Sequence, residues 1–308
     1  KHTQIPIFTR QGEAYQDIKR RVRLVAPTRL SVLILGENGT GKEHIARELH
    51  EQSHRRNKPF VPVDCGTITG DLAKSEFFGH RKGTFTGAYG DRCGLFQTAD
   101  RGTLFLDEIG NLSPETQMLL LRALQERRYK PVGSTREYAF DVRLVAATNE
   151  NLERAISEGR FREDLFHRLN EFTINVPPLS ECGEDILPLA EFFMKHFSEK
   201  HRKPIRGFNS LAAVSLQKYP WPGNIRELKN CIQRAVLLSA DGWISLEGLN
   251  LDLTVGREET ASLSEEEKEK RLLLKTLEEA EGNRARTARM LGISRTSLYE
   301  KLKKYRII

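Results

Sequence analysis

The stretch Gly36-Glu37-Asn38-Gly39-Thr40-Gly41-Lys42 decides the fold of the first half of the chain. It matches the pattern G-x-x-x-x-G-K, follows the apolar run Val32–Leu35, and opens an amphipathic segment. Glycines let backbone N–H groups turn inward around phosphates, the helix start adds a positive dipole, and the lysine reaches the β- and γ-phosphates. We therefore expect Gly36 to Glu43 to bind a nucleoside triphosphate. Glu43 stands where a serine or threonine usually holds Mg²⁺, so other groups or waters must hold the metal.

A second piece of a nucleotide site is an apolar run that ends in two acids, Leu104-Phe105-Leu106-Asp107-Glu108. At the end of a strand, Asp107 can hold Mg²⁺ directly or through water, and Glu108 can orient and deprotonate the attacking water. Taken alone, two acids at the end of a strand indicate only a solvated acidic turn. With the phosphate loop on the same sheet, the pair predicts ATP hydrolysis. Asn149 ends another apolar strand, where it can sense the γ-phosphate.

Strand-like and helical segments alternate outward from these motifs. The expected strands are Ser31–Leu35, Phe60–Val63, Thr103–Leu106 and Val142–Ala146, and the expected helices between them are Lys42–His50 and Glu115–Glu126. This alternation predicts an α/β fold, a parallel sheet with helices on both faces. Val176-Pro177-Pro178 ends the pattern, and the helical segments Asp185–Lys200, Ser210–Lys218 and Ile225–Ser239 follow.

We therefore expect four parts. An α/β domain spans residues 1–175, and a small all-α lid spans 176–250. A linker covers 251–263, and a C-terminal all-α helix-turn-helix domain covers 264–308. A capping box at Ser264 and Glu267 opens the first helix of this last domain.

Composition excludes secreted, membrane and disordered proteins. The 308 residues are 38% apolar and 30% charged, without an apolar run long enough to span a membrane and without a signal peptide. Cys65, Cys93, Cys182 and Cys231 lie far apart, as expected of reduced thiols in a cytoplasmic protein. The chain begins at Lys1 rather than Met, so we expect a fragment with a regulatory domain upstream, most often a phosphorylated receiver.

The net charge of +7 is concentrated at one end. Residues 283–308 hold eight cations and one acid, Glu300, so the rest of the chain sums to zero. A local basic footprint of this kind indicates nucleic-acid binding, although a solvated basic helix would carry the same charge.

These motifs together resemble the AAA+ activators of sigma-54 RNA polymerase, the nitrogen-regulation-type enhancer-binding proteins, over nearly the whole chain. The most specific segment is Glu76–Ala88. Within it, Gly83-Thr84-Phe85-Thr86-Gly87-Ala88 is similar to the family's G-A-F-T-G-A loop, which contacts the sigma factor. Its two glycines allow a mobile tip, and Phe85 offers an apolar anchor.

The resemblance also implies the remaining parts of the ATPase. Arg162 and Arg168 correspond to the arginine fingers that reach the γ-phosphate of a neighbouring subunit. Arg226, in Trp221–Leu228, corresponds to the sensor that touches nucleotide from the lid. Catalysis between subunits implies a homo-oligomer, assembled from dimers into a hexameric or heptameric ring, with ATP and Mg²⁺ as cofactors.

The C-terminal segment resembles the Fis-like domain that ends this family. Ala288, Gly292 and Leu298 have the spacing of the small residue, turn glycine and core apolar residue of a helix-turn-helix. A hairpin used only for dimerisation is the alternative. The residues expected at double-stranded enhancer DNA are Arg286, Arg295, Thr296, Ser297, Tyr299 and Lys301.

Three residues depart from the family pattern: Thr84, Asp64 and Gln97, the last of which stands where the family often has glutamate. Thr84 replaces the alanine of the sigma-contacting loop, and we expect altered loop conformations rather than lost contact. Asp64 replaces an asparagine that bonds the catalytic glutamate in this family. An ionised aspartate cannot donate a hydrogen bond to Glu108. We therefore expect Asp64 to weaken or rewire the coupling of hydrolysis to sigma engagement.

The segment His50-Glu51-Gln52-Ser53-His54 matches the zinc-protease pattern H-E-x-x-H. It falls at the far end of the phosphate-loop helix and lacks an evident third ligand, which makes zinc proteolysis the least favoured reading. The favoured function is an ATP-driven activator that opens promoters with sigma-54 RNA polymerase holoenzyme. The alternative is a DNA-binding regulator that uses its AAA+ domain for assembly and does not activate sigma-54.

Overall fold

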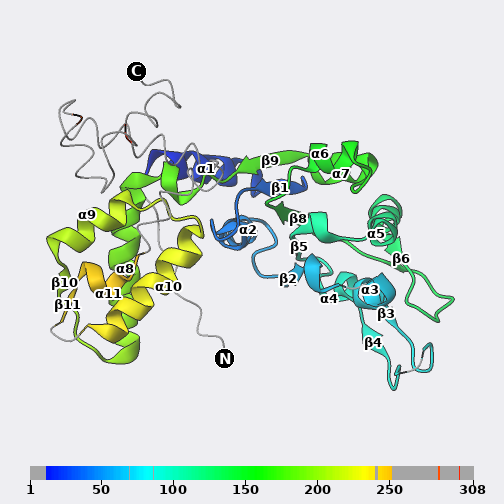
Figure 1. Ribbon diagram of the computed structural model, residues 1–308. Coiled ribbons are helices and arrows are strands. Elements are labelled where there is room, and N and C mark those ends of the chain that lie inside the picture. Colours follow the sequence, from blue (N-terminus) through cyan, green and yellow to red (C-terminus); the bar gives the residue numbers. More distant parts are fainter. Residues whose placement is uncertain are drawn as a thin grey trace. The chain divides into compact units, whose positions relative to one another are not determined.

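The computed structural model describes residues 12–68, 70–85, 87–239 and 242–251, together with Arg284 and Leu298. The chain divides into two units, residues 1–250 and 251–308. Figure 1 labels the helices and strands of the first unit. Its helices are α1 (Glu13–Val25), α2 (Lys42–Glu51), α3 (Gly70–Phe78), α4 (Leu95–Thr98), α5 (Pro114–Glu126), α6 (Leu152–Ser157), α7 (Glu163–Leu169), α8 (Gly183–His201), α9 (Ser210–Lys218), α10 (Asn224–Leu238) and α11 (Leu246–Leu249). Its strands are β1 (Val32–Leu35), β2 (Phe60–Asp64), β3 (Gly79–His80), β4 (Arg92–Cys93), β5 (Thr103–Asp107), β6 (Arg128–Tyr129), β7 (Tyr138–Ala139), β8 (Arg143–Thr148), β9 (Phe172–Asn175), β10 (Gly207–Phe208) and β11 (Trp243–Ile244), and short 3₁₀ turns cover Cys65–Thr67, Ile109–Asn111 and Leu179–Glu181.

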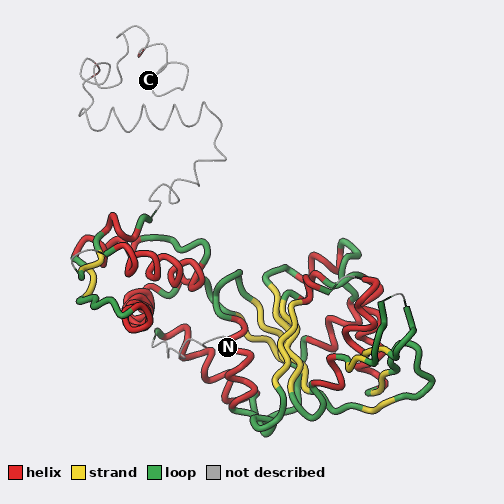
Figure 2. The backbone as a smooth tube through the Cα atoms, turned by 90° about the horizontal axis from the view of Figure 1, so that it is seen from below, coloured by secondary structure: helices red, strands yellow, loops and turns green. Residues whose placement is uncertain are grey.

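The described part of the chain forms a five-stranded sheet in the order β2-β5-β8-β1-β9. All four pairings are parallel. The carboxyl ends of the strands therefore meet at one edge of the sheet, where ligands of open α/β sheets bind. Figure 2 shows this sheet between helices that lie on both of its sides.

Successive side chains of a strand point to opposite faces of the sheet. Alternate residues of each strand are therefore buried against different layers of helices. On one face, Val32, Ile34 and Phe105 pack with buried residues of α1 and α2. On the other face, Leu33 and Leu104 pack with residues of α3, α5 and α7. The central strand β8 is buried along its whole length, which requires the continuous apolar run seen in its sequence.

The α/β fold is confirmed, and each expected strand and helix of the first unit is present to within a residue or two at its ends. The elements of the α/β layers that were not anticipated are α1, α3, α4, α6, α7 and β9. The helix α1 precedes the phosphate loop, and β9 forms the edge of the sheet beside β1.

The residues after β9 form a helical lid, which we define as 176–250. Its long helices α8 and α10 pack against each other, and β10 and β11 form a short parallel pair. Cys231, buried in α10, donates to the carbonyl of Leu249, and burial raises its pKa to about 11. It is therefore a protonated core thiol, whereas Cys93 is exposed.

Two short antiparallel hairpins extend from the α/β part. One pairs β3 with β4 and carries the Gly83–Ala88 loop; the other pairs β6 with β7. The hairpins join each other through a bridge between His80 and Val132. Figure 1 shows both on the side of the α/β part away from the lid.

Candidate nucleotide-binding site

The phosphate loop connects β1 to α2 at the carboxyl edge of the sheet. Gly39 and Gly41 have φ angles of 82° and 97°, a left-handed backbone that glycine adopts without a steric penalty. Gly41 is also the N-terminal cap of α2, so the unpaired N–H groups of the first helical turn face the loop. The loop therefore has the backbone conformation and the helix dipole that a polyphosphate requires.

Lys42 is buried, with its side chain 6% exposed. Its Nζ donates to the carbonyls of Gly36 at 2.9 Å and Glu37 at 3.3 Å, and lies 3.4 Å from Oε1 of Glu108. The two motifs predicted from sequence thus meet through a direct ion pair. A buried ammonium held only by carbonyls and one carboxylate is well placed to bind phosphate oxygens.

Asp107 and Glu108 follow β5 at the same edge of the sheet. Glu108 has a left-handed backbone, with φ 49° and ψ 52°, which is uncommon for a residue with a side chain. Burial and the neighbouring charge of Glu108 hold the pKa of Asp107 above its usual value. A bound cation would relieve this repulsion, so a divalent metal fits the carboxylates at this position.

Asp64 ends β2 in register with Asp107. Its Oδ1 accepts a hydrogen bond from the N–H of Gly66 at 2.9 Å, and it caps the 3₁₀ turn Cys65–Thr67. Its charge adds to the repulsion that raises the pKa of Asp107. The structure therefore places Asp64 as a third acid at this edge and as a turn cap.

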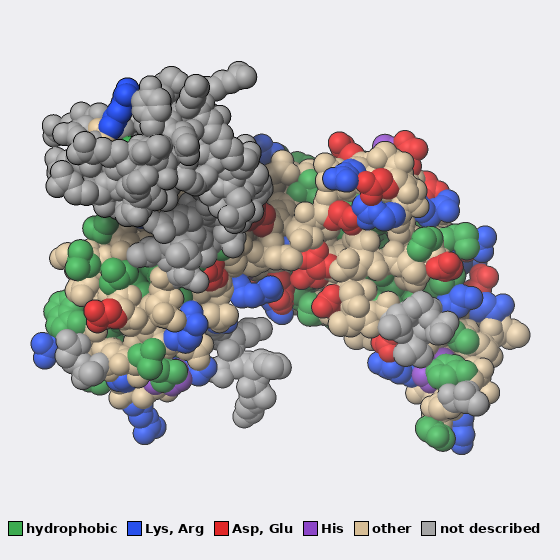
Figure 3. All heavy atoms as spheres, in the orientation of Figure 1, with side chains coloured by type: hydrophobic (Ala, Val, Ile, Leu, Met, Phe, Trp, Pro, Cys, Tyr) green, Lys and Arg blue, Asp and Glu red, His purple; other side chains and the backbone are tan. Residues whose placement is uncertain are grey.

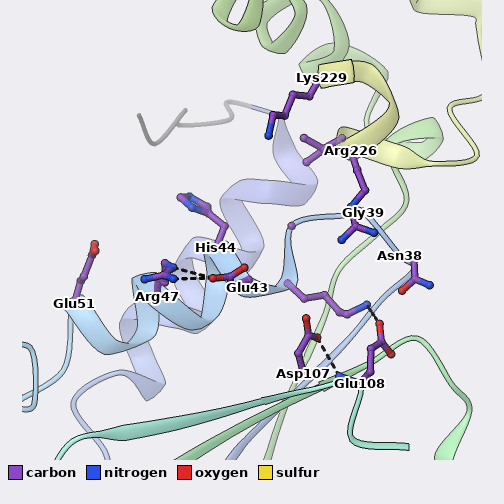
Figure 4. A pocket seen from close by; sticks show the side chains of 13 residues that line it. Asn38, Gly39, Glu43, His44, Arg47, Glu51, Asp107, Glu108, Arg226 and Lys229 are labelled. Atoms are coloured by element: carbon purple, nitrogen blue, oxygen red, sulfur yellow. Dashed lines mark hydrogen bonds and ion pairs between the residues drawn. The ribbon is translucent and has the colours of Figure 1, made fainter. Parts of the chain in front are cut away.

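The lid contributes two cationic residues to the site. Arg226 and Lys229, one turn apart on α10, line the same cavity as Lys42 and Asp107. The N–H of Arg226 donates to the carbonyl of Gly39 at 3.3 Å. Figure 4 shows the side chain of Arg226 reaching from α10 to Gly39 of the phosphate loop, with Lys229 farther along the same helix. The resemblance anticipated Arg226, but Lys229 was missed; its spacing of three from Arg226 on a helix is the signal that could have found it.

Asn224 is fully buried and joins the lid to the phosphate loop. Its Nδ2 donates to Oε2 of Glu37 at 2.9 Å and to the carbonyl of Asn38 at 3.1 Å, while its Oδ1 accepts from the N–H of Leu179 at 2.7 Å. Gly39 also lies against the lid, since a Cβ there would clash with the carbonyl of Gly223. Sequence reasoning gave Asn224 no role of its own.

These residues enclose a cavity of about 470 Å³, which is large enough for a nucleotide. Its wall continues along α2 through His44 and Arg47 to Glu51. Burial lowers the pKa of His44, which favours the neutral imidazole. Glu43 is tied to Arg47 at 2.7 Å one helical turn away. In the view of Figure 3, acidic and basic side chains gather in the middle of the molecule, between the lid and the α/β part.

Seven residues predicted for the nucleotide site do not line this cavity: Gly36, Glu37 and Thr40 of the phosphate loop, Asp64, Asn149, Arg162 and Arg168. Asn149 lies beside it and donates its N–H to Oε2 of Glu108 at 3.4 Å. Arg162 precedes α7 and pairs with Asp164 at 2.7 Å, and Arg168 lies in the last turn of α7. Within one chain, therefore, neither arginine reaches the cavity lined by Lys42 and Glu108.

The H-E-x-x-H segment does not form a zinc site. The helix α2 ends at Glu51, so His50 and His54 do not share a helical face. His50 is buried, and its Nδ1 lies 2.9 Å from Oγ1 of Thr103. No group of three or more potential metal-ligating residues occurs among the described residues.

Some predicted residues lie outside the described part of the chain. They are Thr86 of the Gly83–Ala88 loop and the DNA-contacting residues Arg286, Arg295, Thr296, Ser297, Tyr299 and Lys301. Ser264 and Glu267, of the expected capping box, also lie outside it. Leu298, the expected core residue of the helix-turn-helix, is helical and 2% exposed. None of the helices that the structure describes is long and apolar enough to cross a membrane.

Comparison with protein families identifies three consecutive segments. Residues 8–175 match the sigma-54 interaction domain, 180–266 match the AAA+ ATPase lid domain, and 266–305 match the bacterial regulatory proteins of the Fis family. The chain belongs to the sigma-54-dependent transcriptional activators. It is an AAA+ ATPase with a nucleotide site and a C-terminal helix-turn-helix region for DNA binding.

Individual members of the family resemble the chain over nearly its whole length. It is 47% identical over 297 residues to the transcriptional regulatory protein ZraR of Klebsiella oxytoca, covering 94% of this chain and 67% of that protein. It is 45% identical over 306 residues to the regulatory protein AtoC of Escherichia coli, covering 96% of this chain and 66% of that one. The chain thus spans about two thirds of the length of these relatives.

Solved structures agree with this assignment. The crystal structure of NtrX from Brucella abortus in complex with ATP has a TM-score of 0.72 and 35% identity, over 97% of this chain and 69% of that one. The same protein in complex with ADP has a TM-score of 0.74. ATP binding by the sigma-54 activator described here is therefore supported by both fold and sequence.

Proposed function

We propose that this activator hydrolyses Mg·ATP between the subunits of a ring and uses the energy to remodel sigma-54 RNA polymerase holoenzyme, so that promoter DNA opens. The observation that carries the proposal is the meeting of Lys42, Asp107, Glu108 and Arg226 around one cavity. We infer that it acts in the cytoplasm, where RNA polymerase works.

Within the site, Lys42 and the N–H groups of the phosphate loop hold the β- and γ-phosphates. Glu108, at its left-handed position beside Lys42, orients and deprotonates the attacking water. Asn149 reports the state of the γ-phosphate to Glu108 through its backbone N–H. From the lid, Arg226 binds the nucleotide.

Asp107 would hold Mg²⁺, whose charge neutralises phosphate oxygens when it is bound. Asp64 acts on this site through its charge, because it raises the pKa of Asp107. Replacing Asp64 with asparagine would remove that repulsion and the carboxylate cap of the following turn. The expected result is a changed coupling between hydrolysis and sigma engagement.

Arg162 and Arg168 act on the γ-phosphate of the neighbouring subunit. Both lie outside the nucleotide cavity of their own chain. A residue that completes the site of a neighbouring subunit must lie outside its own. A closed ring provides one such neighbour for every subunit. We infer a hexamer or heptamer assembled from dimers.

The Gly83–Ala88 loop contacts the sigma factor. It stands at the end of a hairpin, and Phe85 is 38% exposed at its tip, so an apolar side chain is available to a partner. Thr86 is included in this contact by its position in the sequence. The C-terminal residues Arg286, Arg295, Thr296, Ser297, Tyr299 and Lys301 tether the ring to enhancer DNA.

The test is ATP-dependent open-complex formation by purified sigma-54 polymerase. The parent chain is compared with Thr86→Ala and Glu108→Gln, and ATPase is measured in parallel. We expect Thr86→Ala to hydrolyse ATP without opening the promoter, and Glu108→Gln to do neither. ATPase by the parent without any opening would contradict the proposal.

A further inference from the structure

The Gly83–Ala88 loop contains two glycines, Gly83 and Gly87, that have free space around them. Gly83 and Gly87 have φ angles of 80° and 107°, and a Cβ added at either would meet nothing within 4 Å. The N–H of Gly83 donates to the carbonyl of Ala88 at 2.8 Å, which closes the loop on itself but does not attach it to the body. The contacts of the two described side chains between these glycines, Thr84 and Phe85, therefore help to position the loop.

Phe85 makes one attachment. Its ring packs edge-on against His80, with 4.9 Å between ring centroids. His80 is itself fixed, since its Nδ1 lies 2.6 Å from Oγ of the buried Ser75. The apolar tip of the loop is thus partly covered by the end of β3.

Thr84 makes a second attachment, to the other hairpin. Its Oγ1 donates to the carbonyl of Arg81 at 2.9 Å, which fixes the direction of its methyl group. That methyl faces Gly133, in the turn between β6 and β7. A Cβ at Gly133 would overlap Cγ2 of Thr84 and lie 3.2 Å from its Cβ. The space left by the glycine is therefore occupied by the threonine methyl.

The turn that carries Gly133 is tied to the base of the loop. The N–H of Val132 donates to the carbonyl of Gly79 at 2.9 Å, and its carbonyl accepts from the N–H of Arg81 at 3.0 Å. Asp91 accepts from the N–H of Lys82 at 2.8 Å and pairs with Arg81. These bonds fix the base of the loop, so Thr84 can join its tip to a firm surface.

We propose that Thr84 is a positioning residue that latches the Gly83–Ala88 loop onto the turn at Gly133 and restrains its engagement with the sigma factor. The second half of this statement rests on the proposed function of the loop. An alanine at position 84 would lack both the hydroxyl that bonds Arg81 and the methyl that fills the space at Gly133. The latch is therefore a property of this chain's threonine.

Trypsin cleavage after Arg81 and Lys82 tests the latch without any partner. These bonds lie at the base of the loop, so their cleavage requires local opening. We expect Thr84→Ala to be cut about threefold to tenfold faster than the parent, while cleavage after Arg154 is unchanged. Thr84→Ser retains the hydroxyl and Thr84→Val retains a methyl, so each should restore part of the protection.

A double-variant cycle tests the contact itself. Gly133→Ala should speed cleavage more in the parent, where its Cβ displaces the Thr84 methyl, than in Thr84→Ala, where that methyl is absent. The backbone strain of a side chain at φ 75° is common to both backgrounds and cancels in the cycle. Equal cleavage rates for the parent and Thr84→Ala, or strictly additive effects of the two substitutions, would overturn the latch.

Binding to purified sigma-54 in the presence of ADP tests the restraint. We expect Thr84→Ala to bind about threefold to tenfold more tightly than the parent. Faster cleavage with equal sigma-54 affinity would overturn the restraint. If no protein of the series binds sigma-54 although cleavage follows the expected order, the latch stands and the proposed contact of the loop with sigma fails.

Discussion

At the scale of single residues, the site contains a residue with an uncommon backbone conformation and carboxylates that repel one another. Glu108 has a left-handed backbone, and Asp107 has a raised pKa caused by burial and by Glu108. Both features cost stability in the free protein, and a bound cation would relieve the repulsion at Asp107. Such conflicts are typical of functional sites, where stability and activity oppose each other.

Asp107→Asn is expected to raise the melting temperature while abolishing ATP hydrolysis. Because the folded pKa of Asp107 lies above its ordinary value, its ionised form destabilises the fold above that pKa. The penalty falls as the pH drops through the folded pKa and is absent once the pH lies below the ordinary pKa of an aspartic acid. Thermal unfolding of parent and variant between neutral pH and pH 4.5 should therefore show a difference that shrinks toward acid. A difference that grows toward acid would contradict the raised pKa.

The residues of the site that sequence could predict are those whose role depends on a short motif. Lys42 and Glu108 follow from local patterns, because a phosphate loop and an acidic strand end are each contiguous. Asn224 could not be found this way, since its three hydrogen bonds lead to Glu37, Asn38 and Leu179, far from it along the chain. The lowered pKa of His44 likewise depends on burial that no motif encodes.

At the scale of elements, the helix α10 links the lid to the phosphate loop. Asn224→Ala should lower the free energy of unfolding by about 1–3 kcal/mol, because it leaves buried polar groups unpaired, and should weaken ATP binding. Asn230→Ala, on an exposed part of the same helix, is the control and should change stability by less than about 0.5 kcal/mol. Chemical denaturation and ATP titration measure both effects. Equal behaviour of the two variants would show that the Asn224 bonds do not matter.

The buried guanidinium of Arg143 links the C-terminal end of helix α1 to the sheet. Arg143, on β8, donates to the carbonyls of Ala26 at 2.6 Å, Val25 at 2.9 Å and Leu30 at 3.3 Å. Burial lowers its pKa to about 10, so it remains charged at neutral pH. Arg143→Met should destabilise the fold by about 2–4 kcal/mol, because three carbonyls lose a charged donor. The exposed Arg154→Met serves as the control in the same unfolding measurement.

Elements with a strong apolar pattern were predicted, and those with a weak one were missed. The runs at β1, β5 and β8 are continuous because these strands are buried on both faces. The edge strand β9 has the short mixed sequence Phe-Thr-Ile-Asn and is half covered, so its pattern is faint. The helix α1 has a clear apolar face but carries many basic residues, which obscured it.

At the scale of the whole molecule, the proposal of catalysis in trans makes a sharp prediction. Lys42→Ala removes the phosphate ligand, and Arg162→Ala removes a finger but keeps an intact cavity. Each variant alone should be inactive, while a mixture should regain about a quarter of the parent ATPase, since one random interface in four combines the intact halves. Arg154→Ala should remain active by itself. A mixture as inactive as its components would exclude a finger role for Arg162.

The concentration of charge at the C-terminus predicts how DNA binding depends on salt. Eight cations lie within residues 283–308, against one acid. If most contact phosphates, affinity for enhancer DNA should fall by about 10³–10⁵ between 50 and 200 mM salt. Fluorescence anisotropy with a labelled duplex measures this, and ATPase over the same range is the control. A nearly flat response would mean that the basic segment does not contact the backbone.

The order of the strands also has a consequence for synthesis on the ribosome. Val32 of β1 pairs with Val145 of β8 and with Phe172 of β9. The ribosome synthesises β1 before both of these strands, and each lies more than a hundred residues farther along the chain. At about 5–20 residues per second, the delay between β1 and these strands is roughly 6–30 seconds. During this time both hydrogen-bonding edges of an apolar strand are unpaired in the nascent chain. The phosphate loop that follows β1 can therefore take its final form only after β9 has emerged.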